Sequence, residues 1–249
     1  MLRFAVVGDP IAQSRSPVIH TEALRLAGLE GEYTARRVLG GGLGAIVEEI
    51  RAGLLDGVNV TMPLKGEAYE AADVLTTEAE RSASVNTLRL RDGVIEAHST
   101  DTVAFGEIFD RVTGPAQLLI LGAGGSARAA LAAWTGGEVY VSARAMDRAA
   151  ALGRPVQWGE GVDDAVVVNA TPLGMAGESL PPAVLERASF LVDLPYGPAP
   201  TPAVETARKA GIELVDGLEF LAIQAEAAFR WWTGETVDLN RLIEVARNG

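Results

Sequence analysis

Short apolar runs alternate along the chain with amphipathic stretches, and this alternation predicts the secondary structure. The runs at residues 4–8, 57–61, 118–121, 166–169 and 190–193 have the length of strands that are buried in a sheet. The stretches between them place apolar residues three or four positions apart, which is typical of helices with one buried face. Strands that alternate with helices indicate an α/β protein whose parallel strands are covered on both faces.

The predicted elements form two blocks. Strands are expected at residues 4–8, 32–37, 57–61, 83–91, 93–98, 118–121, 138–142, 166–169, 190–193 and 213–215. Helices are expected at residues 17–27, 43–52, 65–72, 102–112, 126–134, 146–152, 182–187, 202–210, 220–232 and 239–247. The second block, from residue 118, repeats strand–helix units, whereas Asp92-Gly93 predicts a hairpin in the first block.

The segment Leu118–Arg128 joins a predicted strand to a helix through a turn of the form G-x-G-x-x-A. Gly122 permits a sharp turn, Gly124 leaves room for a pyrophosphate, and Ala127 keeps the helix close to the sheet. The unpaired N–H groups at the helix start attract phosphate. We therefore expect a dinucleotide site, the alternative being a plain tight turn. Its contacts are expected at Gly122, Ala123, Gly124, Gly125, Ser126 and Ala127.

The tip of the next strand indicates which dinucleotide is bound. A carboxylate about 20 residues after the glycines binds the ribose 2′-hydroxyl of NAD, whereas an arginine there accommodates the 2′-phosphate of NADP. Ala143-Arg144-Ala145 stands at this tip without a carboxylate, and Arg148 follows one helical turn later. Since a guanidinium matches a phosphate in charge and geometry, the pattern favours NADP. The alternative is that Arg144 only covers the sheet edge in solvent.

Two serines follow the first predicted strand. Ser14 and Ser16 are two residues apart, so an extended loop would point both hydroxyls the same way. Hydroxyls beside a helix N-terminus form an uncharged cradle for a carboxylate. The alternative is that Ser16 only caps the helix that follows.

A lysine and an aspartate stand at the starts of two other helices of the first block. Lys65 lies in a first helical turn, where the helix dipole disfavours a cation. A nearby carboxylate or ligand oxygen would explain it, and a partly desolvated lysine can exchange protons near neutrality; the alternative is an ordinary surface lysine. Asp101 precedes helix 102–112, and capping of that helix is an equal alternative to a chemical role.

Composition excludes several classes of protein. The 249 residues carry a formal charge of −12, which argues against nucleic acid because such binding demands basic patches. The chain has no cysteine and two histidines, so disulfides, thiolate metal sites and a purely histidine-based metal site are not expected. No apolar stretch approaches the ~20 residues that span a bilayer. Residues 1–8 are typical of a strand, not of a signal peptide.

Motifs along the whole chain together resemble the shikimate dehydrogenase family. In order, they are GDPIAQSRSPVIH (8–20), NVTMPLK (59–65), SVNT (84–87), STD (99–101), GAGGSAR (122–128), NATPLGM (169–175), DLPYGPAPTP (193–202) and GLEFLAIQAEAAFRWWTG (217–234). The resemblance implies an N-terminal α/β substrate domain at 1–101, completed by 218–249, and a Rossmann-type NADP-binding domain with a parallel sheet at 102–217. It also implies NADPH-dependent, reversible reduction of 3-dehydroshikimate to shikimate in aromatic amino-acid biosynthesis.

The family pattern implies a role for each matching position. Lys65 and Asp101 would form the catalytic pair, in which Lys65 donates the proton or polarises the carbonyl and Asp101 orients it. Ser14 and Ser16 would hold the substrate carboxylate, and Tyr196 would lie near it. The residues that would bind the substrate hydroxyls are Thr61, Asn86 and Gln224. The residues that would join Arg144 and the glycine loop in the cofactor site are Asn169, Thr171, Met175 and Gly217.

The chain departs from the family pattern at several positions. Gln13 and Ser99 replace a usual histidine and a usual asparagine, and a usual glycine is lost just after Asp101. Ala143 and Ala145 replace the usual Asn and Thr at the 2′-phosphate. Each lost hydrogen bond is worth about 0.5–1.5 kcal/mol, and more to a charged phosphate. We therefore expect a weaker preference for NADP than in a typical member, and no reversal.

Two other functions stay open. One is a quinate/shikimate dehydrogenase with relaxed use of NAD and NADP, and the other is a non-catalytic paralogue that binds shikimate or NADP. Retention of Lys65 and Asp101 argues against the paralogue. We expect a cytoplasmic protein with small-molecule partners, without nucleic acid or membrane, and a homodimer stays open.

Overall fold

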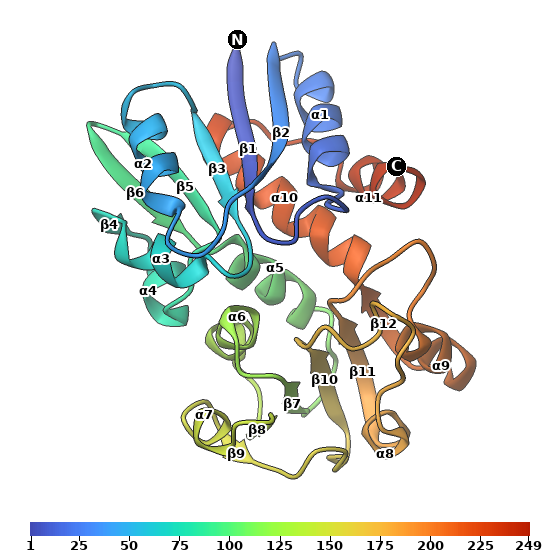
Figure 1. The fold of residues 1–249 in the computed structure, drawn as a ribbon. Coiled ribbons are helices and arrows are strands. Elements are labelled where there is room, and N and C mark those ends of the chain that lie inside the picture. The colour runs from blue at the N-terminus through green and yellow to red at the C-terminus, as the bar shows by residue number, and fades with distance from the viewer. The chain divides into compact units, whose positions relative to one another are not determined.

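The computed structural model describes residues 1–249 and divides the chain into two compact units (Figure 1). Unit 1 comprises Met1–Ala104 with Leu221–Gly249, and unit 2 comprises Phe105–Phe220. The sequence placed these boundaries after residues 101 and 217, where the structure has 104 and 220. In the structure both divisions fall inside helices, α5 (Thr100–Phe109) and α10 (Gly217–Thr233).

Unit 1 contains a mixed sheet of six strands in the order β2-β1-β3-β5-β6-β4. β1 is parallel to β2 and β3, whereas β5 is antiparallel to β3 and β6. It follows that β1, β3 and β6 finish at the end of the sheet where β5 begins. The strands are β1 (Leu2–Gly8), β2 (Gly31–Arg37), β3 (Gly57–Val60), β4 (Val74–Leu75), β5 (Thr87–Arg91) and β6 (Val94–His98).

Helices cover both faces of this sheet because its strands alternate their side chains between the faces. Ala5 and Val7 of β1 belong to a core cluster with apolar residues of α2. Phe4 points to the other face, where its ring stacks on Trp232 of α10 at 4.6 Å. A Cβ on Gly57 would lie 2.5 Å from the indole of Trp232, so a glycine is required there. The remaining helices are α1 (Ser16–Leu26), α2 (Leu43–Arg51), α3 (Lys65–Glu70), α4 (Thr77–Ser82) and α11 (Leu239–Asn248).

Unit 2 contains a sheet of six parallel strands in the order β9-β8-β7-β10-β11-β12. Within the unit this is strand order 3-2-1-4-5-6, which is the Rossmann arrangement. The predicted α/β class with a Rossmann-type parallel sheet is therefore confirmed. The strands are β7 (Gln117–Leu121), β8 (Val139–Ser142), β9 (Arg154–Pro155), β10 (Ala165–Asn169), β11 (Ala188–Asp193) and β12 (Glu213–Asp216).

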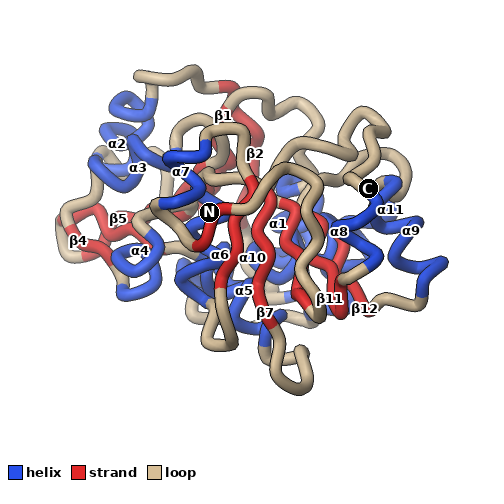
Figure 2. Tube along the Cα trace, turned by 90° about the horizontal axis from the view of Figure 1, so that it is seen from below, coloured by secondary structure: helices blue, strands red, loops and turns tan.

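The helices of unit 2 follow its strands, as the strand–helix repeats predict. α8 and α9 lie beside β11 and β12 in both views (Figures 1 and 2). β10 is entirely buried, in keeping with the apolar run that precedes its last residue, Asn169. The helices are α6 (Gly125–Ala133), α7 (Met146–Ala150), α8 (Pro182–Glu186) and α9 (Pro202–Ala210).

Some local predictions are wrong. The strand predicted at 83–91 begins only at Thr87, because Ala83 adopts a left-handed conformation with φ of 44° and ends α4. The helix predicted at 102–112 begins at Thr100 and ends at Phe109. The sequence did not predict β4 and β9, which have two residues each, or the short, largely polar α4. Elements this short show too few residues for a hydrophobic period. No helix of the protein is both long and apolar enough to cross a membrane.

Candidate active site

Lys65 and Asp101 face each other at the end of the unit 1 sheet where β3 and β6 finish. Lys65 is the first residue of α3, and Asp101 is the second residue of α5. Nζ of Lys65 donates a hydrogen bond to Oδ2 of Asp101, and the two side chains are 18% and 7% exposed. This carboxylate explains a cation in a first helical turn. The capping interpretation of Asp101 is wrong, because α5 already begins at Thr100 and the carboxylate contacts Lys65.

The amide of Asn86 connects Asp101 to two further polar side chains. Its Nδ2 donates to Oδ1 of Asp101 at 2.9 Å, to Oγ1 of Thr100 at 2.9 Å and to Oε1 of Gln224 at 3.3 Å. Its Oδ1 accepts from the backbone N–H of Thr100 at 2.8 Å. Four of the predicted site residues are thus brought together. Thr100 was not among the predicted site residues, yet it bonds the amide of Asn86 and its hydroxyl also donates to Oε1 of Gln224 at 3.2 Å.

The sheet topology explains why these residues meet. Asn86 directly precedes β5, and Asp101 follows β6, so the antiparallel pairing of these strands places both at one end of the sheet. Thr61 follows β3 at the same end, beside the loop after β1. A Cβ on Gly8 would lie 2.4 Å from the methyl group of Thr61, so the two loops pack closely.

The loop after β1 has a different shape from the expected one. Arg15 has helical dihedral angles, φ −86° and ψ −6°, so Ser14 and Ser16 do not flank an extended residue. Ser16 is buried and is the first residue of α1, and its own backbone N–H donates to Oγ of Ser14 at 3.3 Å. The interpretation of Ser16 as the helix cap is therefore wrong, because Arg15 occupies that position.

The glycine loop of unit 2 has the geometry that the motif predicts. Gly122 follows β7 with φ of 107°, and a Cβ there would lie 2.9 Å from the carbonyl oxygen of Ala170. Gly124 is the N-cap of α6, and a Cβ there would meet no atom within 4 Å. Ala127 is fully buried against the sheet. An open space beside the free N–H groups of a helix N-terminus fits a pyrophosphate.

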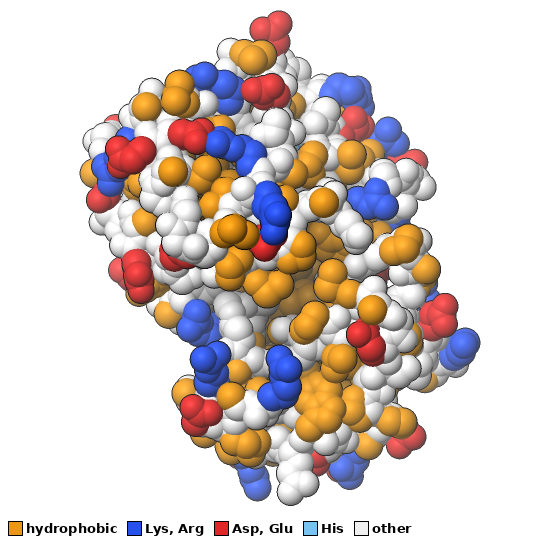
Figure 3. All heavy atoms as spheres, in the orientation of Figure 1, with side chains coloured by type: hydrophobic (Ala, Val, Ile, Leu, Met, Phe, Trp, Pro, Cys, Tyr) orange, Lys and Arg blue, Asp and Glu red, His pale blue; other side chains and the backbone are white.

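Arg144 lies just beyond the end of β8, the strand that pairs with β7. It is exposed, as is Arg148 on α7. Figure 3 shows cationic side chains gathered over the part of the surface where α6 and α7 lie in Figure 1. The position beside the glycine loop is suitable for a 2′-phosphate.

Asn169 supports the neighbouring loop from inside. Its side chain is buried, and its Nδ2 donates to Oδ1 of Asp193 at 2.7 Å and to the carbonyl oxygen of Leu173 at 3.0 Å. Its Oδ1 accepts from the hydroxyl of Thr171 at 2.6 Å. Asp193 also accepts from the hydroxyl of Thr201, and burial raises the pKa of this carboxyl group. Sequence patterns assigned Asp193 no role, because nothing local signals that an aspartate after a strand is wholly buried.

The other predicted residues of unit 2 differ in exposure. Met175 is exposed, whereas Thr171 and Tyr196 are partly exposed. A Cβ on Gly217 would lie 2.4 Å from the carbonyl oxygen of Leu194, so this glycine is required by backbone packing. No group of three or more metal-ligating side chains is placed to hold a metal ion.

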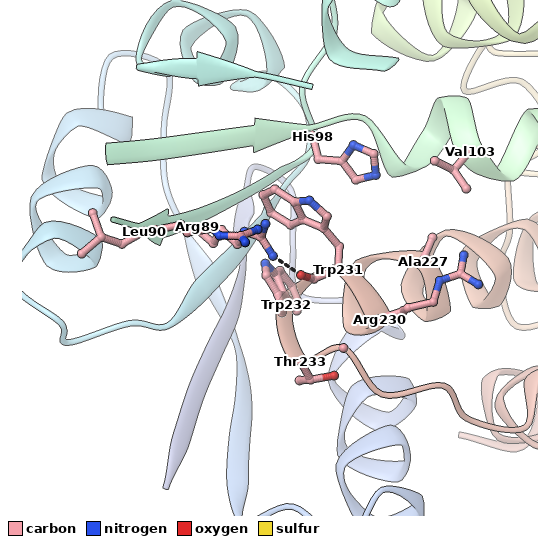
Figure 4. A pocket seen from close by; sticks show the side chains of 11 residues that line it. Arg89, Leu90, His98, Val103, Ala227, Arg230, Trp231, Trp232 and Thr233 are labelled. Carbon is pink, nitrogen blue, oxygen red and sulfur yellow. Dashed lines mark hydrogen bonds between the residues drawn. The ribbon is translucent and has the colours of Figure 1, made fainter. Parts of the chain in front are cut away.

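A cavity of about 690 Å³ lies elsewhere in unit 1 (Figure 4). The indole of Trp231 in its wall contacts the guanidinium of Arg89 at 3.9 Å and the ring of His98 at 5.2 Å. None of the predicted site residues lines it. Arg89 and Arg230, which both line it, pair with Glu96 and Glu226, so their charges are balanced. We assign this cavity no part in the chemistry of the Lys65–Asp101 pair.

Comparison with known proteins gives consistent matches along the chain. Residues 6–88 match the model of the shikimate dehydrogenase substrate binding domain. An NADP(+) shikimate dehydrogenase of Thermus thermophilus is 38% identical over 99% of this chain and 98% of its own length. The Aeropyrum pernix enzyme of the same name is also 38% identical, over 94% and 92% of the two chains.

Solved structures agree with the sequence comparisons. Shikimate 5-dehydrogenase from Thermus thermophilus, in complex with NADP(H) and shikimate, aligns with a TM-score of 0.90 at 36% identity, over 100% of this chain and 99% of the other. A shikimate dehydrogenase in complex with NADP+ aligns with a TM-score of 0.89 at 26% identity, over 100% and 95%. Because the chain is 38% identical to such an enzyme over nearly its full length and shares the fold, it belongs to the shikimate dehydrogenase family.

Proposed function

We propose that this chain catalyses the reversible, NADP-dependent reduction of 3-dehydroshikimate to shikimate. The observation that carries the proposal is the shielded Lys65–Asp101 pair, joined through Asn86 to Gln224. The relatives named NADP(+) shikimate dehydrogenase support it, as does the related structure that holds NADP(H) and shikimate. A place in aromatic amino-acid biosynthesis and in the cytoplasm follows from this reaction as an expectation.

The residues of unit 1 bind the substrate and move the proton. A protonated Lys65 has three N–H groups, so it can donate to Asp101 and to a substrate oxygen at the same time. In the reduction, Lys65 donates its proton to the carbonyl oxygen or stabilises the developing alkoxide. Asp101 keeps the ammonium group oriented. The unit 1 residues assigned to the substrate carboxylate and hydroxyls are Ser14, Ser16, Thr61, Asn86 and Gln224.

The residues of unit 2 fit a dinucleotide. The open backbone at Gly124 and the start of α6 would hold the pyrophosphate, and Arg144 would hold the 2′-phosphate. Asn169 would maintain the loop that carries Thr171 and Met175. When bound, NADPH supplies the hydride.

The proposal is tested by mixing the purified protein with 3-dehydroshikimate and NADPH. Loss of NADPH absorbance is followed, and the product is identified by NMR. We expect one shikimate for each NADPH consumed. In the same assay Lys65→Ala should lose most of the activity. Its matched control is Lys209→Ala, because the chain has two lysines and Lys209 lies on α9, outside the site. Absence of NADPH consumption by the folded wild-type protein would overturn the proposal.

A second candidate function is a quinate/shikimate dehydrogenase that also uses NAD. One observation favours it: alanines flank Arg144, so two side-chain hydrogen bonds to the 2′-phosphate are missing. The proposed function keeps priority because an arginine, and no carboxylate, stands at this strand tip.

A further inference from the structure

A buried chain of polar side chains extends from Asn86 away from the Lys65–Asp101 pair. Oη of Tyr33 on β2 donates to Oδ1 of Asn59 on β3 at 2.7 Å. Nδ2 of Asn59 donates to Oγ1 of Thr87 at 3.0 Å and to the carbonyl oxygen of Asn86 at 3.4 Å. Tyr33, Asn59 and Thr87 are all buried, and none of them was among the predicted site residues.

Each hydrogen bond in this series of side chains fixes the direction of the next hydrogen bond. Because the Tyr33 hydroxyl donates to Oδ1 of Asn59, the amino group of Asn59 must face Thr87. The Thr87 hydroxyl accepts that bond and donates its own proton to Oδ1 of Asn86 at 3.3 Å. The amide of Asn86 is thereby held with its amino group toward Asp101.

The ring of Tyr33 is itself held in place. His20 on α1 stacks on it at 4.2 Å with an interplanar angle of 5°. Both ring nitrogens of His20 are buried without a hydrogen-bond partner, so its contact with Tyr33 is one of ring packing. A tyrosine fixed in this way keeps its hydroxyl directed at Asn59.

We propose that Tyr33 and Asn59 are positioning residues. They act through Thr87 and Asn86 to keep the carboxylate of Asp101 in place for its hydrogen bond with Lys65. The expected effect on turnover rests on the proposed function. The expected effect on the surroundings of Lys65 does not. Neither residue needs to touch the substrate, because each acts through the amide of Asn86.

The test uses Tyr33→Phe, which removes only the hydroxyl, with Tyr140→Phe as the matched control. Tyr140 also uses its hydroxyl in a hydrogen bond, to Glu138 in unit 2. Loss of one hydrogen bond predicts about a two- to tenfold fall in kcat with shikimate for Tyr33→Phe. The KM for NADP should not change, and Tyr140→Phe should behave as wild type. A wild-type kcat for Tyr33→Phe would overturn the inference.

A second measurement does not depend on turnover. In protein labelled with 13C at the lysine ε-carbon, two signals are expected, from Lys65 and Lys209, and Lys209→Arg assigns them. We expect the Lys65 signal to move in Tyr33→Phe and in Asn59→Ala, while the Lys209 signal stays. A shifted Lys65 signal in a protein without shikimate turnover would refute the proposed function and still support the positioning. An unmoved Lys65 signal in both variants would overturn the positioning.

A double-mutant cycle separates positioning from general loss of stability. If Tyr33 acts through Asn86, Tyr33→Phe should have little further effect on kcat in the Asn86→Ala background. Full additivity of the two substitutions would contradict this route. Circular dichroism confirms that each variant is folded, and Tyr33→Phe alone decides the question if Asn59→Ala does not fold.

Discussion

The two units form their candidate sites in different ways. In unit 1 the site consists of side chains that different elements bring together, with Lys65 on α3, Asp101 on α5 and Gln224 on α10. In unit 2 the glycine loop offers backbone N–H groups and open space at Gly124. A backbone cradle fits any pyrophosphate, whereas a side-chain network is specific to one chemistry. The comparison teaches that the reaction is to be inferred from unit 1 and the class of cofactor from unit 2.

The largest expected effect is in unit 1. Lys65→Ala removes the group that we propose donates the proton, so kcat should fall about 10²- to 10⁴-fold. Binding of NADPH, measured by the change in its fluorescence, should stay within about twofold because its proposed contacts are in unit 2. Turnover close to that of Lys209→Ala would show that Lys65 has no such role.

Two glycines of unit 2 should respond differently to the same substitution. Gly122→Ala forces an alanine to φ of 107° and places its Cβ 2.9 Å from a carbonyl oxygen, which should lower the free energy of unfolding by about 1–3 kcal/mol. Gly124→Ala meets no protein atom, so stability should be retained while NADP affinity falls about tenfold. Urea unfolding and NADP titration of both variants measure the difference. Unchanged NADP affinity in Gly124→Ala would place the pyrophosphate elsewhere.

We expect the preference for NADP over NAD to depend mainly on Arg144. Arg144→Ala removes a charged hydrogen-bond donor worth about 1.5–3 kcal/mol, so the KM for NADP should rise about tenfold or more. The KM for NAD, which lacks the 2′-phosphate, should change little. An equal rise for both cofactors would show that Arg144 does not contact this phosphate.

The stability of unit 1 should depend on pH through His20. Burial lowers the pKa of His20 to about 3. The unfolded chain binds the proton near pH 6.5, so stability is greatest above that pH and falls as the pH decreases toward 3. Between about pH 7 and pH 5 the expected loss from His20 is about 2 kcal/mol.

Urea unfolding of wild-type protein and His20→Phe at both pH values isolates this contribution. The pKa of His98 is also lowered by burial, so the variant should retain a smaller pH dependence. An identical pH dependence in the two proteins would show that His20 does not titrate as described.

Local patterns predicted unit 2 better than unit 1. The glycine turn, its strand and its helix are contiguous, so their spacing alone indicates the site and its geometry. In unit 1, Lys65, Asn86, Asp101 and Gln224 are distant in the chain, and only the family resemblance grouped them. Their hydrogen bonds depend on the antiparallel pairing of β5 and β6, which no short motif encodes.

The remaining differences have similar physical reasons. Ser14 and Ser16 were expected to flank an extended residue, but Arg15 is helical because α1 begins directly after it. Tyr33 and Asn59 lie within strands, where a polar residue is usually taken to face solvent. Both are buried because α1 and α10 cover the face of the sheet on which they lie, and this covering is a property of the tertiary structure.

The most direct test of the central claim is a set of initial rates that crosses shikimate and quinate with NADP and NAD. The account predicts that shikimate with NADP gives by far the highest kcat/KM, because Arg144 is expected to bind the 2′-phosphate and the unit 1 residues are expected to bind shikimate. Comparable rates with quinate or with NAD would contradict this and favour the broader dehydrogenase. No turnover in any of the four combinations would contradict catalysis itself and favour a binding protein.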